Sequence, residues 1–302
     1  MSYANLAPNS EALVEAGESV RKVAGGFAFT EGPIWHPRDQ YLLFSDIQGD
    51  VRRRWDESGA VREVSRPANK GNGMTYDAEL DLLVCEHATS TLARVRADGQ
   101  REVLASHFEG KELNSPNDVC VRSDGSIYFT DPPYGRTAAF GVERTQELGW
   151  QGVYRLAPDG VLRLVVAPGE FAAPNGLCFS PDESRLYVDD TERALIRVYD
   201  VAPNGSLRNG RLFAEGLASE LERGRPDGIK TDERGNVWCT GPGGVWIFAP
   251  TGERIGRIAT PEPTANLHWG GADFHTLFLT AGTSLYGLKT RVGPHVEPFM
   301  RQ

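Results

Sequence analysis

The stretch Ala173–Thr191 reads APNGLCFSPDESRLYVDDT and carries the pattern that decides the fold. A polar residue, Asn175, precedes a short apolar run. A Pro-Asp turn follows, and a second apolar run ends in Asp-Asp-Thr. Short apolar runs bounded by Pro, Gly, Asp and Ser are typical of β-strands joined by turns. This segment therefore predicts two consecutive strands.

The same pattern occurs six times along the chain. The other copies begin at Thr30 (TEGPIWHP), Gly71 (GNGMTYD), Ser115 (SPNDVCVRSDG), Arg225 (RPDGIKTDERG) and Thr264 (TANLHWGG). A second strand follows each copy, and in several copies a third strand ends in an Asp-Gly, Asn-Gly or Thr-Gly turn. Such units at intervals of about forty to fifty residues are typical of propeller blades. We expect an all-β, six-bladed β-propeller with a central metal site, formed by residues 1–302 as a single domain.

The two ends of the chain suggest how the ring closes. The N-terminal segment, residues 1–26, includes most of the strand-like stretch Ser19–Phe27, and the last unit ends in TSLYGLKTR. One could complete the sheet of the other. The Gly- and Pro-rich insert Pro132–Gln151 is the one long loop, and it is a candidate lid over the ring.

Composition restricts the possible partners. The 302 residues are 40% hydrophobic and 24% charged, with a formal net charge of -9, so the chain can bury a sizeable core but offers no basic surface for nucleic acid. No stretch is apolar enough to span a bilayer, and the first residues lack the pattern of a secretory signal. We expect a cytoplasmic protein, monomeric or homodimeric, with no nucleic-acid or membrane partner. Its four cysteines lie in strand-like stretches, which indicates small buried hydrophobes.

Aligning the six units places one polar residue before each first strand. These residues are Glu31, Asn72, Asn117, Asn175, Asp227 and Asn266. The innermost strand of each propeller blade lines the channel, so equivalent positions form a ring that faces the axis. Asn-Gly and Asp-Gly are also ordinary turn dipeptides, and for Asn72 and Asn266 a turn role is as well supported as a ligand role. Glu is not a turn former, and a buried carboxylate is costly unless it is paired or coordinated, which favours Glu31 and Asp227 as ligands.

The ligand types indicate which ion would suit the ring. Two carboxylates with amide oxygens, and no His or Cys, form a hard oxygen site that suits Ca²⁺, Mg²⁺ or Mn²⁺. Zn²⁺ remains possible, although its sites usually include nitrogen or sulfur. We expect one divalent cation, with Ca²⁺ as the first candidate.

The motifs EGPIW, LLVCEH, LNSPNDV, GSIYFTDPPYG, PNGLCFSPDE, LYVDDT, RPDGI and GNVW occur in this order. In order and spacing they resemble the SMP-30/gluconolactonase/regucalcin-like family, and bacterial gluconolactonases most closely. The resemblance implies a metal held by Glu31, Asn175 and Asp227, with Asn117 as a direct ligand or a substrate contact. Regucalcin-like relatives carry Arg two residues before that Asn, where this chain has Ser115. Sugar recognition must therefore differ in detail.

The expected reaction is the metal-dependent hydrolysis of a sugar lactone, such as gluconolactone, to the aldonic acid. The cation would act as a Lewis acid, and Asp227 as the general base, with direct nucleophilic attack by Asp227 as an alternative. Candidate substrate contacts are Asn117, Asn114, His87, Glu86 and Tyr134. For His87 a buried structural hydrogen bond is equally supported.

Three aspartates, Asp46, Asp131 and Asp190, recur 14 or 15 residues after ring positions. A shared structural role, such as bonding the backbone of a neighbouring strand, is the better interpretation for them. Two other functions stay open at this point. One is a phosphotriesterase-type, fluorophosphatase-like hydrolase on the same metal, which would need an apolar cleft. The other is a non-catalytic propeller scaffold, which would need no ring carboxylates.

Overall fold

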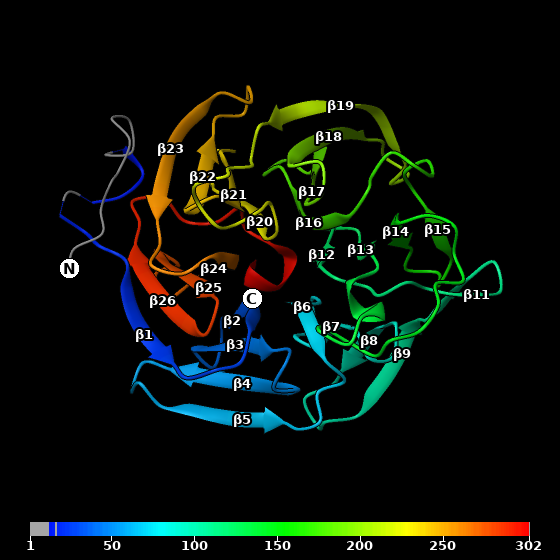
Figure 1. Ribbon diagram of the computed structural model, residues 1–302, viewed down its shortest axis with the longest axis horizontal. Helices are drawn as coiled ribbons and strands as arrows, with labels where there is room; N and C mark the ends of the chain where they lie inside the picture. Colours follow the sequence, from blue (N-terminus) through cyan, green and yellow to red (C-terminus); the bar gives the residue numbers. More distant parts are fainter. Residues whose placement is uncertain (1–11, 16, 302) are drawn as a thin grey trace.

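The computed structural model describes residues 12–15 and 17–301. Six antiparallel four-stranded sheets lie around a central axis (Figure 1). The predicted all-β, six-bladed propeller is therefore confirmed. Each predicted second strand is the second strand of its sheet, counted from the axis.

The bounds of the strands follow the repeat. The first sheet contains β2 (Thr30–His36), β3 (Tyr41–Asp46), β4 (Val51–Asp56) and β5 (Val61–Ser65). The second contains β6 (Gly71–Tyr76), β7 (Leu82–Glu86), β8 (Thr91–Val95) and β9 (Arg101–Ala105). The third contains β12 (Val119–Val121), β13 (Ile127–Asp131), β14 (Gly152–Leu156) and β15 (Leu162–Leu164). The fourth contains β16 (Pro174–Phe179), β17 (Arg185–Asp190), β18 (Leu195–Val201) and β19 (Leu207–Glu215). The fifth contains β20 (Ile229–Thr231), β21 (Val237–Gly241), β22 (Gly244–Phe248) and β23 (Arg254–Ala259).

The sixth sheet joins the two ends of the chain. It contains β24 (Thr264–Gly270), β25 (Thr276–Ala281), β26 (Ser284–Lys289) and, outermost, β1 (Arg21–Gly25). β1 pairs antiparallel with β26, with Arg21 opposite Gly287 and Gly25 opposite Ser284. A strand near the N-terminus thus completes the last blade, and its ladder hydrogen bonds hold the ring together.

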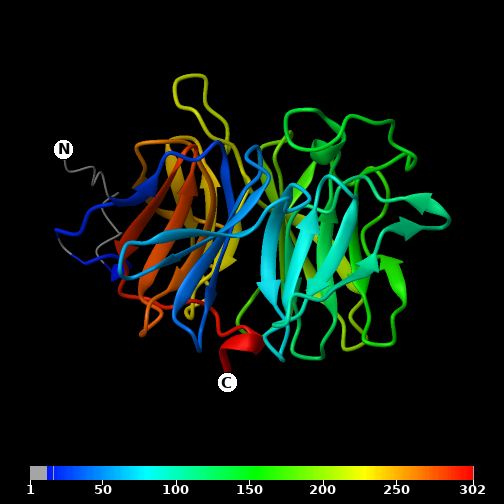
Figure 2. The same cartoon turned by 90° about the horizontal axis from the view of Figure 1, so that it is seen from below.

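Four short elements of the described residues lie outside the blades. The hairpin β10 (His107–Phe108) and β11 (Lys111–Glu112) precedes the third blade, and the 3₁₀ helices are η2 (Tyr134–Arg136) and η3 (Pro298–Arg301). In Figure 2, η2 lies at one end of the axis and η3 at the other. No helix among the described residues is long and apolar enough to cross a membrane.

The core lies between neighbouring blades because side chains alternate along each strand. In β13, Phe129 packs in a cluster with Leu83 of the second blade, and Tyr128 packs with Leu177 of the fourth. Both aromatic side chains are fully buried, and complete burial of a large apolar side chain stabilises a fold by roughly 1.5–3 kcal/mol. The period of two that defines a strand therefore joins each blade to both of its neighbours.

The inner strands approach one another closely at the axis, and glycine permits this approach. A Cβ atom on Gly32 would lie 2.0 Å from the carbonyl oxygen of Asn72 on the next blade, and one on Gly176 would lie 2.1 Å from that of Asp227. A larger residue at either position would push the blades apart. The glycines that follow ring residues are thus required by packing between blades.

Candidate metal and substrate site

A cavity of about 200 Å³ opens on the axis at the end covered by η2. Its polar lining consists of Glu31, Asn72, His87, Asn117, Asn175, Thr191, Arg225 and Asp227. Its apolar lining consists of Phe29, Ile47, Tyr134 and Phe140. The structure therefore brings the four predicted metal ligands together, with His87 and Tyr134 beside them.

The ring residues take their positions from the inner strands. Asn72, Asn175 and Asn266 lie within β6, β16 and β24, whereas Asn117 and Asp227 lie just before β12 and β20. None of the three strand residues forms a turn, so the turn interpretation of Asn72 and Asn266 does not apply. Asn266 does not line the cavity. Its side-chain amide donates to Glu31 Oε2 at 3.1 Å and so orients that carboxylate.

Three buried aspartates hold the backbone that leads into the ring. Each accepts hydrogen bonds from two successive backbone N–H groups, which lie three and two residues before a ring residue. The bonds run from Ala28 and Phe29 to Asp46, from Asn114 and Ser115 to Asp131, and from Ala172 and Ala173 to Asp190. The predicted shared structural role is thereby confirmed. These carboxylates fix the approach to Glu31, Asn117 and Asn175.

Two predicted substrate contacts lie outside the lining of the cavity. Glu86 occupies the same place in the second blade as these aspartates. It accepts hydrogen bonds from Asn69 at 3.1 Å and from Arg101 at 2.5 Å. The Asn114 side chain donates to the carbonyl oxygens of Asp131 and Trp150. Both side chains are buried and serve the scaffold behind the ring.

A chain of hydrogen bonds fixes the amides of the ring. Asn72 Nδ2 donates to Asn117 Oδ1 at 2.7 Å, and Asn117 Nδ2 in turn donates to Asn175 Oδ1. Asn175 Nδ2 donates to Thr191 Oγ1 at 3.0 Å, and that hydroxyl donates to the carbonyl oxygen of Pro226 at 2.7 Å. Pro226 directly precedes Asp227. The chain therefore links three ring amides to the backbone of the catalytic aspartate candidate.

The two ring carboxylates lie in an environment that disfavours their charge. Burial, and secondarily the nearby charge of Asp118, raises the pKa of Glu31 to about 7 against the opposing effect of the Gly32 N–H. Burial also raises the pKa of Asp227 well above its usual value, and the charges of Glu31 and Asp189 add to this effect. The two ring carboxyl groups therefore resist being charged at the same time.

These residues fit a hard divalent cation. The described Lys, Arg and His residues form no ion pair with either carboxylate, and Lys230 pairs instead with Asp118 at 3.8 Å. The buried Oδ1 atom of Asn72, on the cavity wall, has no hydrogen-bond donor. No group of three or more His, Cys, Asp or Glu arranged for a metal occurs among the described residues. Amide oxygens would have to complete the ligand set, and each has a second lone pair to offer.

His87 supplies a neutral imidazole to the cavity. Its Nδ1 lies 3.1 Å from the carbonyl oxygen of Phe140, which places a proton on Nδ1, and its Nε2 lies 3.3 Å from Asn72 Nδ2 and 3.1 Å from Asn117 Oδ1. Burial lowers the pKa of His87 to about 4. Nε2 is therefore an acceptor that faces the ring at neutral pH.

The loop that follows β13 covers the cavity in the place predicted for a lid. The Phe140 ring packs edge-on against Phe29 with centroids 5.2 Å apart. Arg136 donates to the carbonyl oxygens of Leu113 and Asn114, and it pairs with Glu112 at 2.9 Å. These contacts hold the loop in place over the ring. Tyr134, from η2, contributes a half-buried aromatic wall.

A family described as "SMP-30/Gluconolactonase/LRE-like region" matches residues 29–283. This chain belongs to that family. A gluconolactonase from Zymomonas mobilis is 34% identical over 95% of this chain and 85% of its own. The solved structure of a gluconolactonase from Xanthomonas campestris aligns with a TM-score of 0.86, at 34% identity over 94% of this chain and 93% of that chain. A calcium-binding regucalcin from Agrobacterium tumefaciens has a TM-score of 0.77 at 19% identity, over 94% and 98%, and shows the fold alone.

Some residues that line the cavity of this SMP-30/gluconolactonase-like protein were not predicted from the sequence motifs. Phe29, Thr191 and Arg225 line the cavity, yet none was a candidate from the sequence. Phe29 and Arg225 each stand two residues before a ring carboxylate, so the aligned repeat contained a signal for both. Ser115, at the equivalent place in the third blade, accepts a hydrogen bond from Gly135 N at 2.9 Å and anchors the lid.

Proposed function

We propose that this protein hydrolyses a sugar lactone of the aldonolactone class to its aldonic acid with the help of one divalent cation. The observation that carries the proposal is the pair of carboxylates, Glu31 and Asp227, that line one cavity at the axis and form no ion pair with the described residues. Membership of a family with gluconolactonase relatives of 34% identity supports the lactone.

Glu31, Asn175 and Asp227 would hold the cation, and Asn117 would hold it directly or contact the substrate. When bound, a hard cation such as Ca²⁺ polarises a lactone carbonyl and stabilises the negative charge that develops on its oxygen. Asn266 and the Asn72–Thr191 chain keep the ligands in place. Such fixed positioning is required for a site that must bind charge without reorganising.

Asp227 would act as the general base. It removes a proton from a water molecule as the water oxygen bonds to the carbonyl carbon. The ring C–O bond then breaks, and the released oxygen takes up a proton to become a hydroxyl group. Direct attack by Asp227 on the carbonyl carbon would instead give an acyl-enzyme that water cleaves.

The cavity offers partners for the hydroxyl groups of a sugar. His87 Nε2, the buried Asn72 Oδ1 and the Thr191 hydroxyl line one cavity with the ring. A fluorophosphatase-type hydrolase would favour an apolar cleft, and Phe29, Ile47, Tyr134 and Phe140 give this cavity apolar walls beside its polar ring. The gluconolactonase relative of 34% identity is what favours the lactone. A scaffold without catalysis would gain nothing from the two unpaired carboxylates.

One panel of assays tests the proposal. Enzyme stripped with EDTA is supplied with Ca²⁺, Mg²⁺, Mn²⁺ or Zn²⁺ and offered five- and six-carbon aldonolactones, an aryl ester and a fluorophosphate. We expect hydrolysis of at least one aldonolactone that depends on added cation. Turnover of the fluorophosphate alone would favour the phosphotriesterase alternative, and no turnover with any cation would reject the enzyme.

A further inference from the structure

A second hollow joins the catalytic cavity on its outer side. This groove, of about 440 Å³, shares Phe29, Arg225 and Asp227 with the cavity. Its outer wall is formed by Pro261–Thr264 and by Arg223. A ligand whose reactive carbon lies at the ring can therefore extend past Asp227 into the groove.

Two arginines project from a short segment whose backbone is fixed. Gly243 N donates to the Arg223 carbonyl oxygen at 2.8 Å, and Thr240 Oγ1 donates to that of Arg225 at 3.2 Å. Gly224, between them, lies so close to Gly241 that a Cβ would come within 2.3 Å of its carbonyl oxygen. These contacts therefore fix the backbone positions of Arg223 and Arg225.

The guanidinium groups of this segment are available to a ligand. Arg223 and Arg225 are exposed, and no hydrogen bond or ion pair of either side chain occurs with the described residues. By contrast, the neighbouring Glu222 already pairs with Arg257 at 2.5 Å. Arg225 is also the one Lys or Arg among the described residues that line the catalytic cavity.

The negative groups that face the groove are already engaged. Glu262 accepts hydrogen bonds from Thr283 N at 2.8 Å, Ser284 Oγ at 2.5 Å and Tyr286 Oη at 2.8 Å. Asp227 belongs to the proposed cation site. The two arginines thus remain as groups that can take up a new anion, and a planar guanidinium binds tetrahedral oxyanions through paired N–H groups.

We propose that this groove is a subsite for an anionic group, a phosphate or a sulfonate, on the distal carbon of the lactone. This inference rests on the proposed lactonase function. With the carbonyl at the ring, an anion on the exocyclic carbon projects beyond Asp227 toward Arg225. Arg225 binds the anion directly, and Arg223 adds charge from the outer end. The subsite sets which aldonolactone the enzyme prefers.

The test compares glucono-1,5-lactone with its 6-phospho and 6-sulfo analogues. We expect wild-type kcat/KM to be higher for at least one anionic lactone. Arg225→Ala should lower the value for that substrate by about 10- to 100-fold more than for gluconolactone, and Arg223→Ala should have a smaller effect. Arg163→Ala, an exposed arginine on β15, is the matched control and should change neither value. The relative loss on the two analogues shows which anion is bound.

Two results separate this subsite from the proposed function. If gluconolactone is hydrolysed but Arg225→Ala affects charged and neutral lactones equally, the subsite is wrong and the lactonase stands. If no lactone is hydrolysed, the proposed function fails, and calorimetric titration with 6-phosphogluconate decides the subsite alone. Binding that weakens at least tenfold in Arg225→Ala supports the subsite, and the absence of wild-type binding overturns it.

Discussion

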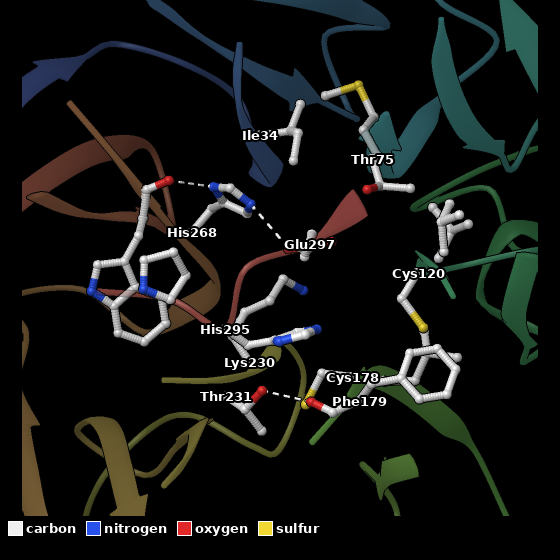
Figure 3. A pocket seen from close by; sticks show the side chains of 16 residues that line it. Ile34, Thr75, Cys120, Cys178, Phe179, Lys230, Thr231, His268, His295 and Glu297 are labelled. Carbon is white, nitrogen blue, oxygen red and sulfur yellow. Dashed lines mark hydrogen bonds and ion pairs between the residues drawn. The ribbon is translucent and has the colours of Figure 1, made fainter. Parts of the chain in front are cut away.

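The two ends of the axial channel place the same kind of residue in opposite environments. Glu31 lies at the end covered by η2, and Glu297 lies at the end closed by η3, where the C-terminal segment enters the channel (Figures 2 and 3). At the closed end the remaining hollow is only about 20 Å³. At the other end the cavity is about ten times larger, about 200 Å³.

Glu31 and Glu297 differ in the positively charged groups near each carboxylate. Burial raises the pKa of Glu31 to about 7. Burial acts on Glu297 in the same direction, but His268, whose Nε2 lies 3.5 Å from Glu297 Oε1, and the positive charge of Lys230 outweigh it, and the pKa falls below its usual value. The closed end contains its own cation, because the charges of Asp118 and Glu297 raise the pKa of the half-buried Lys230 against the effect of desolvation. The open end has two carboxylates that form no ion pair with the described Lys, Arg and His residues, and the proposed cation would balance their charge.

The largest expected effect is on catalysis at the open end. Asp227→Asn removes the proposed base and one ligand charge while it keeps the shape of the side chain. We expect kcat/KM for the preferred lactone to fall about 100- to 10,000-fold. The measurement is a steady-state assay in saturating cation, with circular dichroism to show that the variant is folded. A variant that retains both cation and full activity would refute the base assignment.

The next largest effect is expected at the closed end. Lys230→Met removes the internal cation and leaves Asp118 and Glu297 without it. Loss of one partner from a buried ion pair costs about 3–5 kcal/mol in unfolding free energy, which denaturant unfolding of the cation-free protein would measure. Lys289→Met is the control, because Lys289 pairs with Asp273 at the surface and should cost less than about 1 kcal/mol. Equal losses of unfolding free energy in the two variants would show that Lys230 stabilises the fold no more than a surface lysine does.

The third expected effect links cation binding to pH. In the cation-free protein, between pH 4.5 and about 7, folded Glu31 holds a proton that the unfolded chain has lost. This contribution to stability is complete below pH 4.5 and is lost as pH rises through about 7. A cation competes with that proton, so its affinity should be about 100-fold lower at pH 5 than at pH 8.

Calorimetric titration with Ca²⁺ at the two pH values measures this difference, with Glu31→Gln as the control. The variant should bind Ca²⁺ weakly at both pH values. A wild-type affinity that does not change with pH would mean that Glu31 is not a ligand.

The smallest effect concerns one hydrogen bond to the substrate. His87→Gln replaces the Nε2 acceptor by a shorter and more flexible group, and we expect kcat/KM to fall about tenfold. Because the pKa of His87 is lowered to about 4, the wild-type profile between pH 5 and 8 should show no step that this variant removes. His107→Gln, on the exposed β10, should leave activity unchanged. A His87 variant with the activity of the control would limit His87 to anchoring the lid.

Much of the scaffold around the site follows from local pattern. The strand period and the turn residues predicted the six sheets, and the spacing of Asp46, Asp131 and Asp190 predicted their shared role. The sequence could not show that Glu86, at the equivalent place in the second blade, accepts hydrogen bonds from side chains such as Asn69 and Arg101 in place of the backbone. Nor could it show Arg225 at the cavity, because an arginine before Pro-Asp is ordinary in a loop.

The sequence by itself determined the repeat, the ring of oxygen-bearing residues and the family. All three can be recognised from residues close together along the chain, because the spacing of those residues determines where strands and turns form. Only the tertiary structure decided which ring residues share a cavity, that the Asn-Gly pairs at 72 and 175 allow blades to pack closely, and that Lys230 and Glu297 meet at the far end of the channel. Those contacts join segments from different blades, and their energies depend on distance and burial, which no local spacing records.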